Sequence, residues 1–220
     1  GAHVQAVFEI QPYPSGLPRN IEQCLNDYNI PLYLSHTVTA IHGNKRLTGV
    51  TISRVDEHFK PIPGTEKEYS CDTLILSVGL IPENELSLDA GVTLDGRTKG
   101  ALVDEYFQTN VEGIFAAGNV LHVHDLVDFV SMEAEALADS AAEYIREGTL
   151  PDCPVEIRTD RNINHTVPQR VSGTRGFKLS MRVNRPIKEC RIVVRQDGVE
   201  IAAKKMKKAI PAEMIQMTID

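Results

Sequence analysis

The chain has 220 residues, of which 42% are hydrophobic and 24% are charged, an ordinary composition for a globular protein. No apolar run approaches the roughly 18 residues that a membrane-spanning helix needs, and the first residues lack the basic and apolar regions of a signal peptide. The sequence therefore predicts no membrane span, and we expect a cytoplasmic protein.

The charge divides the chain near residue 153. Residues 1–153 carry 9 Lys and Arg against 23 Asp and Glu, a net charge of −14, whereas residues 154–220 carry 14 against 7, a net charge of +7. This break predicts a domain boundary. The basic residues are scattered among strand-like residues with few aromatics, which favours a solvated face, or a surface docked on an acidic domain, over a nucleic-acid site.

Four cysteines lie far apart and form no Cys-x-x-Cys pair. This spacing argues against a zinc site and against a redox-active dithiol within the chain. We expect reduced and mostly buried thiols at Cys24, Cys71, Cys153 and Cys190.

The first 71 residues predict an α/β start followed by an antiparallel meander. A short apolar run ends at Glu9, Pro18 opens a helix with apolar residues at helical spacing, and residues 32–34 form a second short strand. Between residues 36 and 71 the hydrophobic period changes to two, with turns between the runs, which is typical of antiparallel strands.

The middle of the chain predicts buried strands and one long helix. Residues 73–78 (TLILSV) are apolar nearly throughout, as in a strand that helices cover on both faces. Shorter apolar runs follow at 101–103 and 114–117. A helix is expected from about Leu126 to Ile145, capped by Asp125. Its predicted buried stripe is Val130, Ala134, Leu137, Ala141 and Ile145.

Residues 154–220 predict a small all-β unit. Alternating runs indicate strands at 169–172, 177–183, 189–195, 199–205 and 214–219. Asp197-Gly198 between two such runs is a good hairpin signal.

Residues 109–119 read TNVEGIFAAGN and resemble a fingerprint of flavoproteins similar to glutathione reductase. That fingerprint has Thr, four residues, four apolar or aromatic residues and Gly-Asp, and Asn119 stands here where the family has aspartate. The resemblance implies that the backbone at Gly118 approaches the ribityl chain of FAD closely and that Asn119 accepts a hydrogen bond from a ribityl hydroxyl. It predicts Gly118, Asn119 and Val120 as cofactor contacts. It also points the N-terminus of the following helix at the flavin, where its N–H groups favour the anionic reduced form.

A second segment supports the same family. Residues 72–84 read DTLILSVGLIPEN and resemble the string D-x-x-x-x-A-x-G-x-x-P-N, where the chain of these flavoproteins leaves the NAD(P) domain. Ser77 replaces the alanine, and one residue separates Pro82 from Asn84. The resemblance adds Gly79 to the predicted cofactor-binding residues.

Two further side chains are candidates within this frame. An acidic residue that ends the second strand of a dinucleotide fold binds the ribose hydroxyls, so Glu9 is a candidate contact that favours NAD over NADP; the alternative is a solvated strand end. The i, i+2 pair His122 and His124 has no third strong ligand beside it in the sequence, so no metal site is predicted. The resemblance brings His124 near the flavin ring as a candidate for proton transfer to substrate, and the alternative is a simple helix-entry residue.

The chain is thus identified as resembling the C-terminal part of an FAD-dependent pyridine nucleotide-disulfide oxidoreductase-like flavoprotein, most like NAD(FAD)-dependent dehydrogenases. The expected fold is α/β, with partial Rossmann-like dinucleotide-binding domains, an antiparallel β-meander and a small all-β C-terminal domain. The expected divisions are a remnant of an NAD-binding domain (1–79), the C-terminal segment of an FAD-binding domain (80–150) and the β-rich part (151–220).

The resemblance implies hydride transfer between nicotinamide and flavin in an intact oxidoreductase that uses FAD and NAD. No G-x-G-x-x-G motif occurs in the chain, so we expect a truncated piece that is inactive alone and needs a missing N-terminal half. The expected partners are a small-molecule substrate or electron acceptor and no nucleic acid, and a homo-oligomer stays open. The alternative is a non-catalytic docking or regulatory module that has lost cofactor binding.

Overall fold

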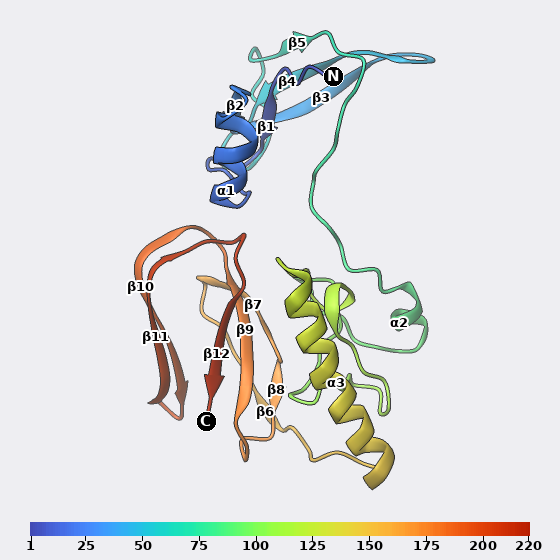
Figure 1. The fold of residues 1–220 in the computed structure, drawn as a ribbon, viewed down its shortest axis with the longest axis vertical. Helices are drawn as coiled ribbons and strands as arrows, with labels where there is room; N and C mark the ends of the chain where they lie inside the picture. Colours follow the sequence, from blue (N-terminus) through green and yellow to red (C-terminus); the bar gives the residue numbers. More distant parts are fainter. The chain divides into compact units, whose positions relative to one another are not determined.

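The computed structural model describes residues 1–220, which form two compact units, Gly1–Val78 and Gly79–Asp220 (Figure 1). We call them unit 1 and unit 2 and describe each by itself. No helix in either unit combines the length and the apolar character that crossing a membrane requires.

Unit 1 begins with the expected α/β element. Strand β1 (Val7–Glu9) pairs in parallel with β2 (Leu32–Leu34), and the connection contains α1 (Pro18–Asn20) followed by the π-helical turn η1 (Ile21–Asn26). Proline suits the first turn because its fixed φ matches the helix and its missing N–H would have had no partner there. The predicted apolar face of this helix is not buried, since Cys24 is exposed and Tyr28 is 74% exposed.

The antiparallel meander of unit 1 is confirmed. Strands β3 (His36–Gly43), β4 (Leu47–Arg54) and β5 (Lys67–Tyr69) form one sheet in the order β3-β4-β5. The central strand β4 is the most buried, with Ile52 at 1% exposure. The Phe8 ring lies 5.4 Å from the ring of Tyr33 and 5.0 Å from that of Tyr69, so aromatic packing joins the parallel pair to the meander.

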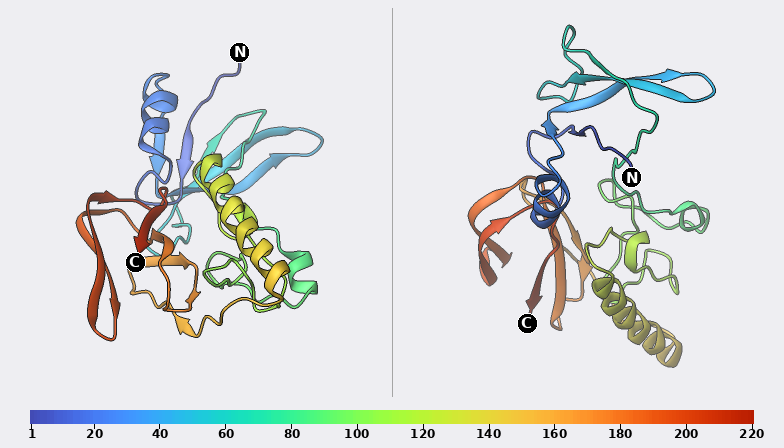
Figure 2. Two further views of the ribbon diagram at one scale, coloured as in Figure 1. Left: turned by 60° about the horizontal axis from the view of Figure 1, so that its bottom comes forward. Right: turned by 45° about the horizontal axis from the view of Figure 1, so that its top comes forward.

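The strand predicted at residues 73–78 is wrong for this structure. The segment between β5 and Pro82 has no helix or strand and runs as an extended connection (Figures 1 and 2). Ile75, Leu76 and Val78 are between 63% and 89% exposed. A parallel strand requires neighbouring strands for its backbone hydrogen bonds, and no strand within residues 1–220 pairs with this one.

The helices of unit 2 are α2 (Glu85–Asp89), the 3-10 turn η2 (Gly118–Val120) and α3 (Val127–Glu147). The long helix matches the prediction, and its inward face matches in part. Val130, Leu137 and Ala141 are partly buried as predicted, whereas Ala134 and Ile145 are exposed. The partly buried face also contains Glu133 and Tyr144. Tyr144 packs edge-on against Phe115 at 5.9 Å, which fixes that rotation of the helix.

The β-rich part of unit 2 is confirmed in most of its strands. It contains β6 (Val155–Glu156), β7 (Ile163–Val167), β8 (Arg170–Val171), β9 (Phe177–Val183), β10 (Ile187–Gln196), β11 (Val199–Ala209) and β12 (Ile215–Ile219). They form a β12-β9-β7 sheet, the β10-β11 hairpin and a β6-β8 pair, seen from two further directions in Figure 2. Strand β7 escaped prediction because its buried residues include the polar His165 and Thr166.

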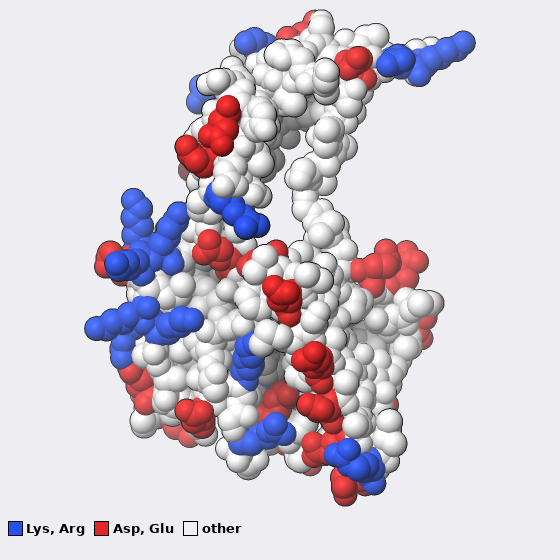
Figure 3. Space-filling view, in the orientation of Figure 1, with Lys and Arg blue, Asp and Glu red and all other residues white.

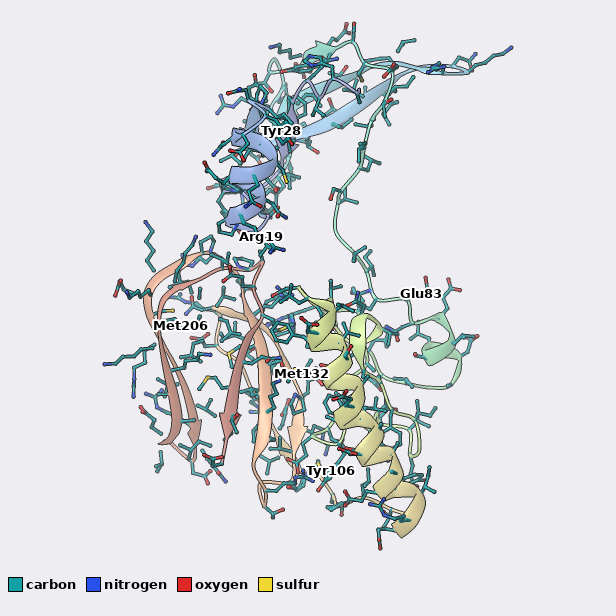
Figure 4. The ribbon with its side chains drawn as sticks, viewed as in Figure 1. Arg19, Tyr28, Glu83, Tyr106, Met132 and Met206 are labelled. Atoms are coloured by element: carbon teal, nitrogen blue, oxygen red, sulfur yellow. The ribbon has the colours of Figure 1, made fainter.

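Alternate residues of β9 and β12 form the larger core of unit 2. The buried side chains are Leu179, Met181, Val183, Ala209, Ile215, Met217 and Ile219. Met206 of β11 packs against this core (Figure 4). Basic side chains gather over the β10-β11 hairpin in Figure 3.

A smaller core contains Val92, Ala101, Val103, Leu121 and Val167. The apolar runs at 101–103 and 114–117 form no strand ladder, because each makes only one isolated bridge, Leu94 with Ala101 and Gln108 with Phe115. A buried strand at 114–117, as in the family fingerprint, is therefore wrong for this structure. Across the predicted boundary at residue 150, the Gln169 N–H donates to the Val103 carbonyl at 3.0 Å within unit 2.

All four cysteines are free, as expected, but the prediction that most are buried is wrong. Cys153 is buried, Cys24 is exposed, and Cys71 and Cys190 are intermediate.

Candidate functional site

The candidate site is the turn at residues 118–125 and the helix that follows it. Gly118 has φ 72°, and a Cβ atom at this position would lie 3.2 Å from Cγ1 of Val130 on α3. Glycine is therefore favoured twice, by its left-handed backbone and by the close helix. The sequence predicted a glycine at a close approach, and here the neighbour it meets is α3.

Asn119 is exposed beside this glycine. Its Oδ1 accepts a hydrogen bond from the His124 N–H at 3.0 Å, which folds the turn back toward α3. An amide oxygen has two lone pairs and the amide nitrogen has two further donors, so the side chain keeps hydrogen-bonding capacity toward a ligand. Val120 is 37% exposed and points its carbonyl inward.

Asn84 connects the two segments that resemble the flavoprotein family. It is 5% exposed, and its Nδ2 donates to the carbonyls of Lys99 and Val120 at 3.0 and 2.8 Å. The end of the first segment is thus hydrogen bonded to Val120, the residue that follows the second segment. A buried amide with these partners holds the backbone of η2 in place.

Glu133 is the centre of the site, and the sequence analysis missed it. Its Oε1 accepts from the Gly118 N–H at 2.7 Å and lies 3.1 Å from Nε2 of His124, and its Oε2 lies 2.8 Å from Nε2 of His122. The signal was present in the sequence, because Glu133 lies three residues after Val130 on the inward face of α3, where an apolar residue is the usual choice.

The two histidines are buried and lie side by side. The side chains of His122 and His124 are each 1% exposed, that of Glu133 is 9% exposed, and the histidine ring centroids are 4.4 Å apart. His124, the predicted proton-transfer residue, therefore faces Glu133 inside the unit. The pair lacked a third ligand in the sequence, and the structure brings Glu133 to within 4.8 Å of both.

The electrostatics of the site follow from its burial. Burial alone would raise the pKa of the Glu133 carboxyl, but hydrogen bonds from His122, His124 and the Gly118 N–H outweigh it and lower the pKa to about 2. Glu133 is therefore ionised at neutral pH. Burial lowers the pKa of the neighbouring His165 to about 4, and the proximity of His122 adds to the shift.

Asp125 does not cap α3, contrary to the prediction. The N-cap residue is Leu126, with no side-chain cap, and the Asp125 carboxylate instead pairs with Arg182 of β9 and accepts the Met214 N–H at 2.6 Å. Arg182 also donates to the Val123 carbonyl at 2.8 Å. The loop before α3 is thus tied to the β-rich part, and the first N–H groups of α3 have no side-chain partner.

The other two predicted contacts lie elsewhere. Glu9 ends β1 in unit 1, where its carboxylate accepts the Gln11 N–H at 2.9 Å and binds the Ser15 hydroxyl. Gly79, with φ 98°, is exposed at the start of unit 2 and has open space where a Cβ would be. The site at residues 118–125 therefore includes Gly118, Asn119, Val120 and His124 but neither of these.

Comparison with known proteins identifies relatives for most of the chain. A family sequence model described as "Pyridine nucleotide-disulphide oxidoreductase" matches residues 4–142. The thioredoxin reductase of Treponema pallidum is 29% identical over 125 residues, covering 56% of this chain and 38% of that protein. The ferredoxin reductase component of chlorobenzene dioxygenase from Cupriavidus sp. is 26% identical over 116 residues, covering 49% and 28%.

Among solved structures, T. acidophilum thioredoxin reductase is similar with a TM-score of 0.52 and 26% identity, covering 66% of this chain and 45% of that one. The chain thus spans less than half the length of each of these three relatives.

Proposed function

Because the chain belongs to the pyridine nucleotide-disulphide oxidoreductase family, we propose that it carries the flavin-facing part of an enzyme that transfers hydride between NAD(H) and FAD. The family is one of oxidoreductases that use FAD and NAD(P)H. When bound, FAD supplies the redox chemistry, and the protein supplies binding, orientation and electrostatics.

The observation that carries the proposal is the Gly118-Asn119 turn, packed against the 21-residue helix α3 that begins at Val127 without a side-chain cap. Asn119 is exposed and retains free donors and a lone pair, which suits a ribityl hydroxyl. The uncapped N–H groups of α3 and the helix dipole suit an anionic ring. These residues fit a flavin, with the neutral Asn119 in place of the family's aspartate making a weaker contact.

Glu133 acts at this site by positioning other groups rather than by contacting the flavin. Its carboxylate holds the Gly118 N–H and both histidine rings, so it orients the turn relative to α3. The burial of His124 and its contact with Glu133 support the same role for that residue better than direct proton transfer to a substrate. Glu9 is proposed as a ribose contact that selects NAD, on the strength of its place at the end of a strand in a parallel pair.

The exposed apolar run at residues 74–81 supports the proposal that the activity belongs to a longer protein, in which further parts of the family fold pack against this chain. Leu80 and Ile81 are 72% and 78% exposed and continue the run of Ile75, Leu76 and Val78. Runs of this kind are rare on the surface of a complete soluble domain. We propose that a further parallel sheet of the intact protein covers them.

The test is FAD binding measured by flavin fluorescence and by absorbance in the visible region. We expect Asn119→Ala to raise the Kd for FAD about 2- to 10-fold, the value of one hydrogen bond, and Asn119→Asp to lower it. Asn44→Ala, at an exposed turn of unit 1, is the matched control and should leave the Kd unchanged. Equal affinity in all four proteins would remove Asn119 from the proposed site.

One observation favours a second function, a docking module. The β10-β11 hairpin exposes Lys188, Lys204, Lys205, Lys207 and Lys208, and Lys and Arg gather over it (Figure 3). Such a surface suits an acidic protein partner. A chain that binds no FAD, yet associates with an acidic partner through this hairpin in a salt-dependent manner, would favour this function.

A further inference from the structure

We propose that His122, His124 and Glu133 bind one transition-metal cation of the zinc class. Each residue offers a ligand atom, and these atoms all lie within 4.8 Å of one another. The side chains are buried, at 1%, 1% and 9% exposure, so the cluster is not a chance grouping on a solvated surface. The proposal does not depend on flavin binding.

The donor set selects the class of metal. Two imidazole nitrogens and one carboxylate are the three-ligand set of zinc sites that keep an open fourth position, whereas Mg²⁺ and Ca²⁺ prefer oxygen ligands alone. Zinc bonds of about 2.0–2.1 Å in a tetrahedron separate neighbouring ligand atoms by roughly 3.3 Å. Nε2 of His122 lies 2.8 Å from Oε2 of Glu133, Nε2 of His124 lies 3.1 Å from Oε1, and all the ligand atoms lie within 4.8 Å of one another, so side-chain rotations can bring both nitrogens and one oxygen around one ion.

The charge of the cluster also calls for a cation. Glu133 is a buried carboxylate whose ion-pair partners are the two histidines, and no lysine or arginine pairs with it. The ionised carboxylate places a negative charge in the interior of unit 2. A dication bound to the two nitrogens and one carboxylate oxygen compensates that charge directly.

The polar atoms of the two rings are only half used by hydrogen bonds within the protein. Nδ1 of His122 and Nδ1 of His124 are both buried and have no partner. Zinc-binding histidines normally donate from the second nitrogen to an outer partner, and loss of such a partner costs about 10- to 100-fold in affinity. We therefore expect an affinity below that of zinc sites with a complete outer shell.

The supporting shell around the carboxylate and the loop is already in place. The Gly118 N–H donates to Oε1 of Glu133 and orients it. Asp125 and Arg182 hold the end of the histidine loop, and Asn84 holds its start through the Val120 carbonyl. The ligands thus come from two elements whose relative position is set by contacts other than the metal.

The test is a Zn²⁺ titration of the full chain after removal of metals with EDTA, followed by calorimetry, with Co²⁺ as a spectroscopic probe. We expect one Zn²⁺ per chain and visible d–d absorption of bound Co²⁺. His124→Asn and Glu133→Ala should each weaken Zn²⁺ binding at least ~100-fold, more than loss of an outer-shell partner costs. His58→Asn is the matched control, because His58 lies on the surface 3.7 Å from Glu57 and should leave the binding unchanged.

Two outcomes would overturn the proposal. One is that the wild-type chain binds no stoichiometric Zn²⁺, in which case the cluster is held by hydrogen bonds alone. The other is that Zn²⁺ binding persists unchanged in both ligand variants. Circular dichroism of each variant shows whether α3 is retained. If a variant is misfolded, the Zn²⁺ titration of the wild-type chain still tests the proposal by itself.

Discussion

At the scale of single residues, the site depends on polar side chains that are buried with their partners. Asn84, Glu133 and Arg182 each hold backbone groups of the segment 118–125 through hydrogen bonds, and Asp125 within that segment accepts the Met214 N–H. Removal of one partner leaves the other buried without a hydrogen bond, which lowers the free energy of unfolding more than removal of both partners does.

The Asp125–Arg182 pair gives the first prediction. The side chains are 12% and 14% exposed, so Asp125→Asn leaves a buried guanidinium without its counter-charge and should lower the free energy of unfolding by about 3 kcal/mol. Urea denaturation measures the change. The control is Glu200→Gln, which breaks the Arg191–Glu200 pair at 38–46% exposure and should cost less than about 1 kcal/mol. Equal costs for the two variants would contradict the argument.

His165 gives a prediction of pH dependence. Burial, with His122 nearby, lowers its pKa from 6.5 to about 4, so between these values the unfolded chain binds a proton that the folded chain does not. Stability should therefore fall as the pH falls from 6.5 to 4, by up to about 3 kcal/mol from this residue. Urea denaturation at pH 7 and pH 4.5, in EDTA, should show a smaller loss for His165→Asn than for the wild type. The exposed His58→Asn should keep the wild-type loss.

At the scale of elements, part of unit 2 consists of loops whose backbones pack closely together without forming a regular sheet. Residues 91–121 make isolated bridges rather than ladders, and side chains such as Asn110 accept backbone N–H groups in their place. Two of these segments pack closely against each other at Gly100 and Leu121. The contact sets the start of the histidine loop, because Leu121 immediately precedes His122.

Gly100 tests this packing. A Cβ atom there would lie 1.6 Å from the Leu121 carbonyl oxygen, so Gly100→Ala must displace a backbone that is buried. We expect a loss of at least ~2 kcal/mol in the free energy of unfolding, measured by thermal or urea denaturation. Gly96→Ala, in the same loop with no atom within 4 Å of the added methyl group, should stay within about 0.5 kcal/mol of the wild type. A small effect at both positions would show that the two segments do not pack this closely.

At the scale of the whole molecule, the chain consists of two units joined by an exposed apolar segment. The chain belongs to the pyridine nucleotide-disulphide oxidoreductase family and spans less than half the length of the relatives it matches.

Limited proteolysis tests this organisation. A protease that cleaves beside large apolar residues should cut the isolated chain first within residues 74–81, because Ile75, Val78 and Ile81 are 78–89% exposed and lie outside any helix or strand. The product expected to persist is a fragment close to unit 2, identified by mass spectrometry. A first cut at the Asp197-Gly198 hairpin turn instead would contradict the prediction.

The sequence by itself determined the features that depend on local pattern. Strand alternation located β9 and β10–β12, helical periodicity located α3, and the strings at 72–84 and 109–119 indicated the family, because each signal is contained within a few consecutive residues. The face of α3, the partners of Asp125 and the third member of the histidine cluster needed the tertiary structure. Glu133 reaches His122 across 11 residues and Arg182 reaches Asp125 across 57, and no local pattern records which distant polar groups will satisfy each other when they are buried together.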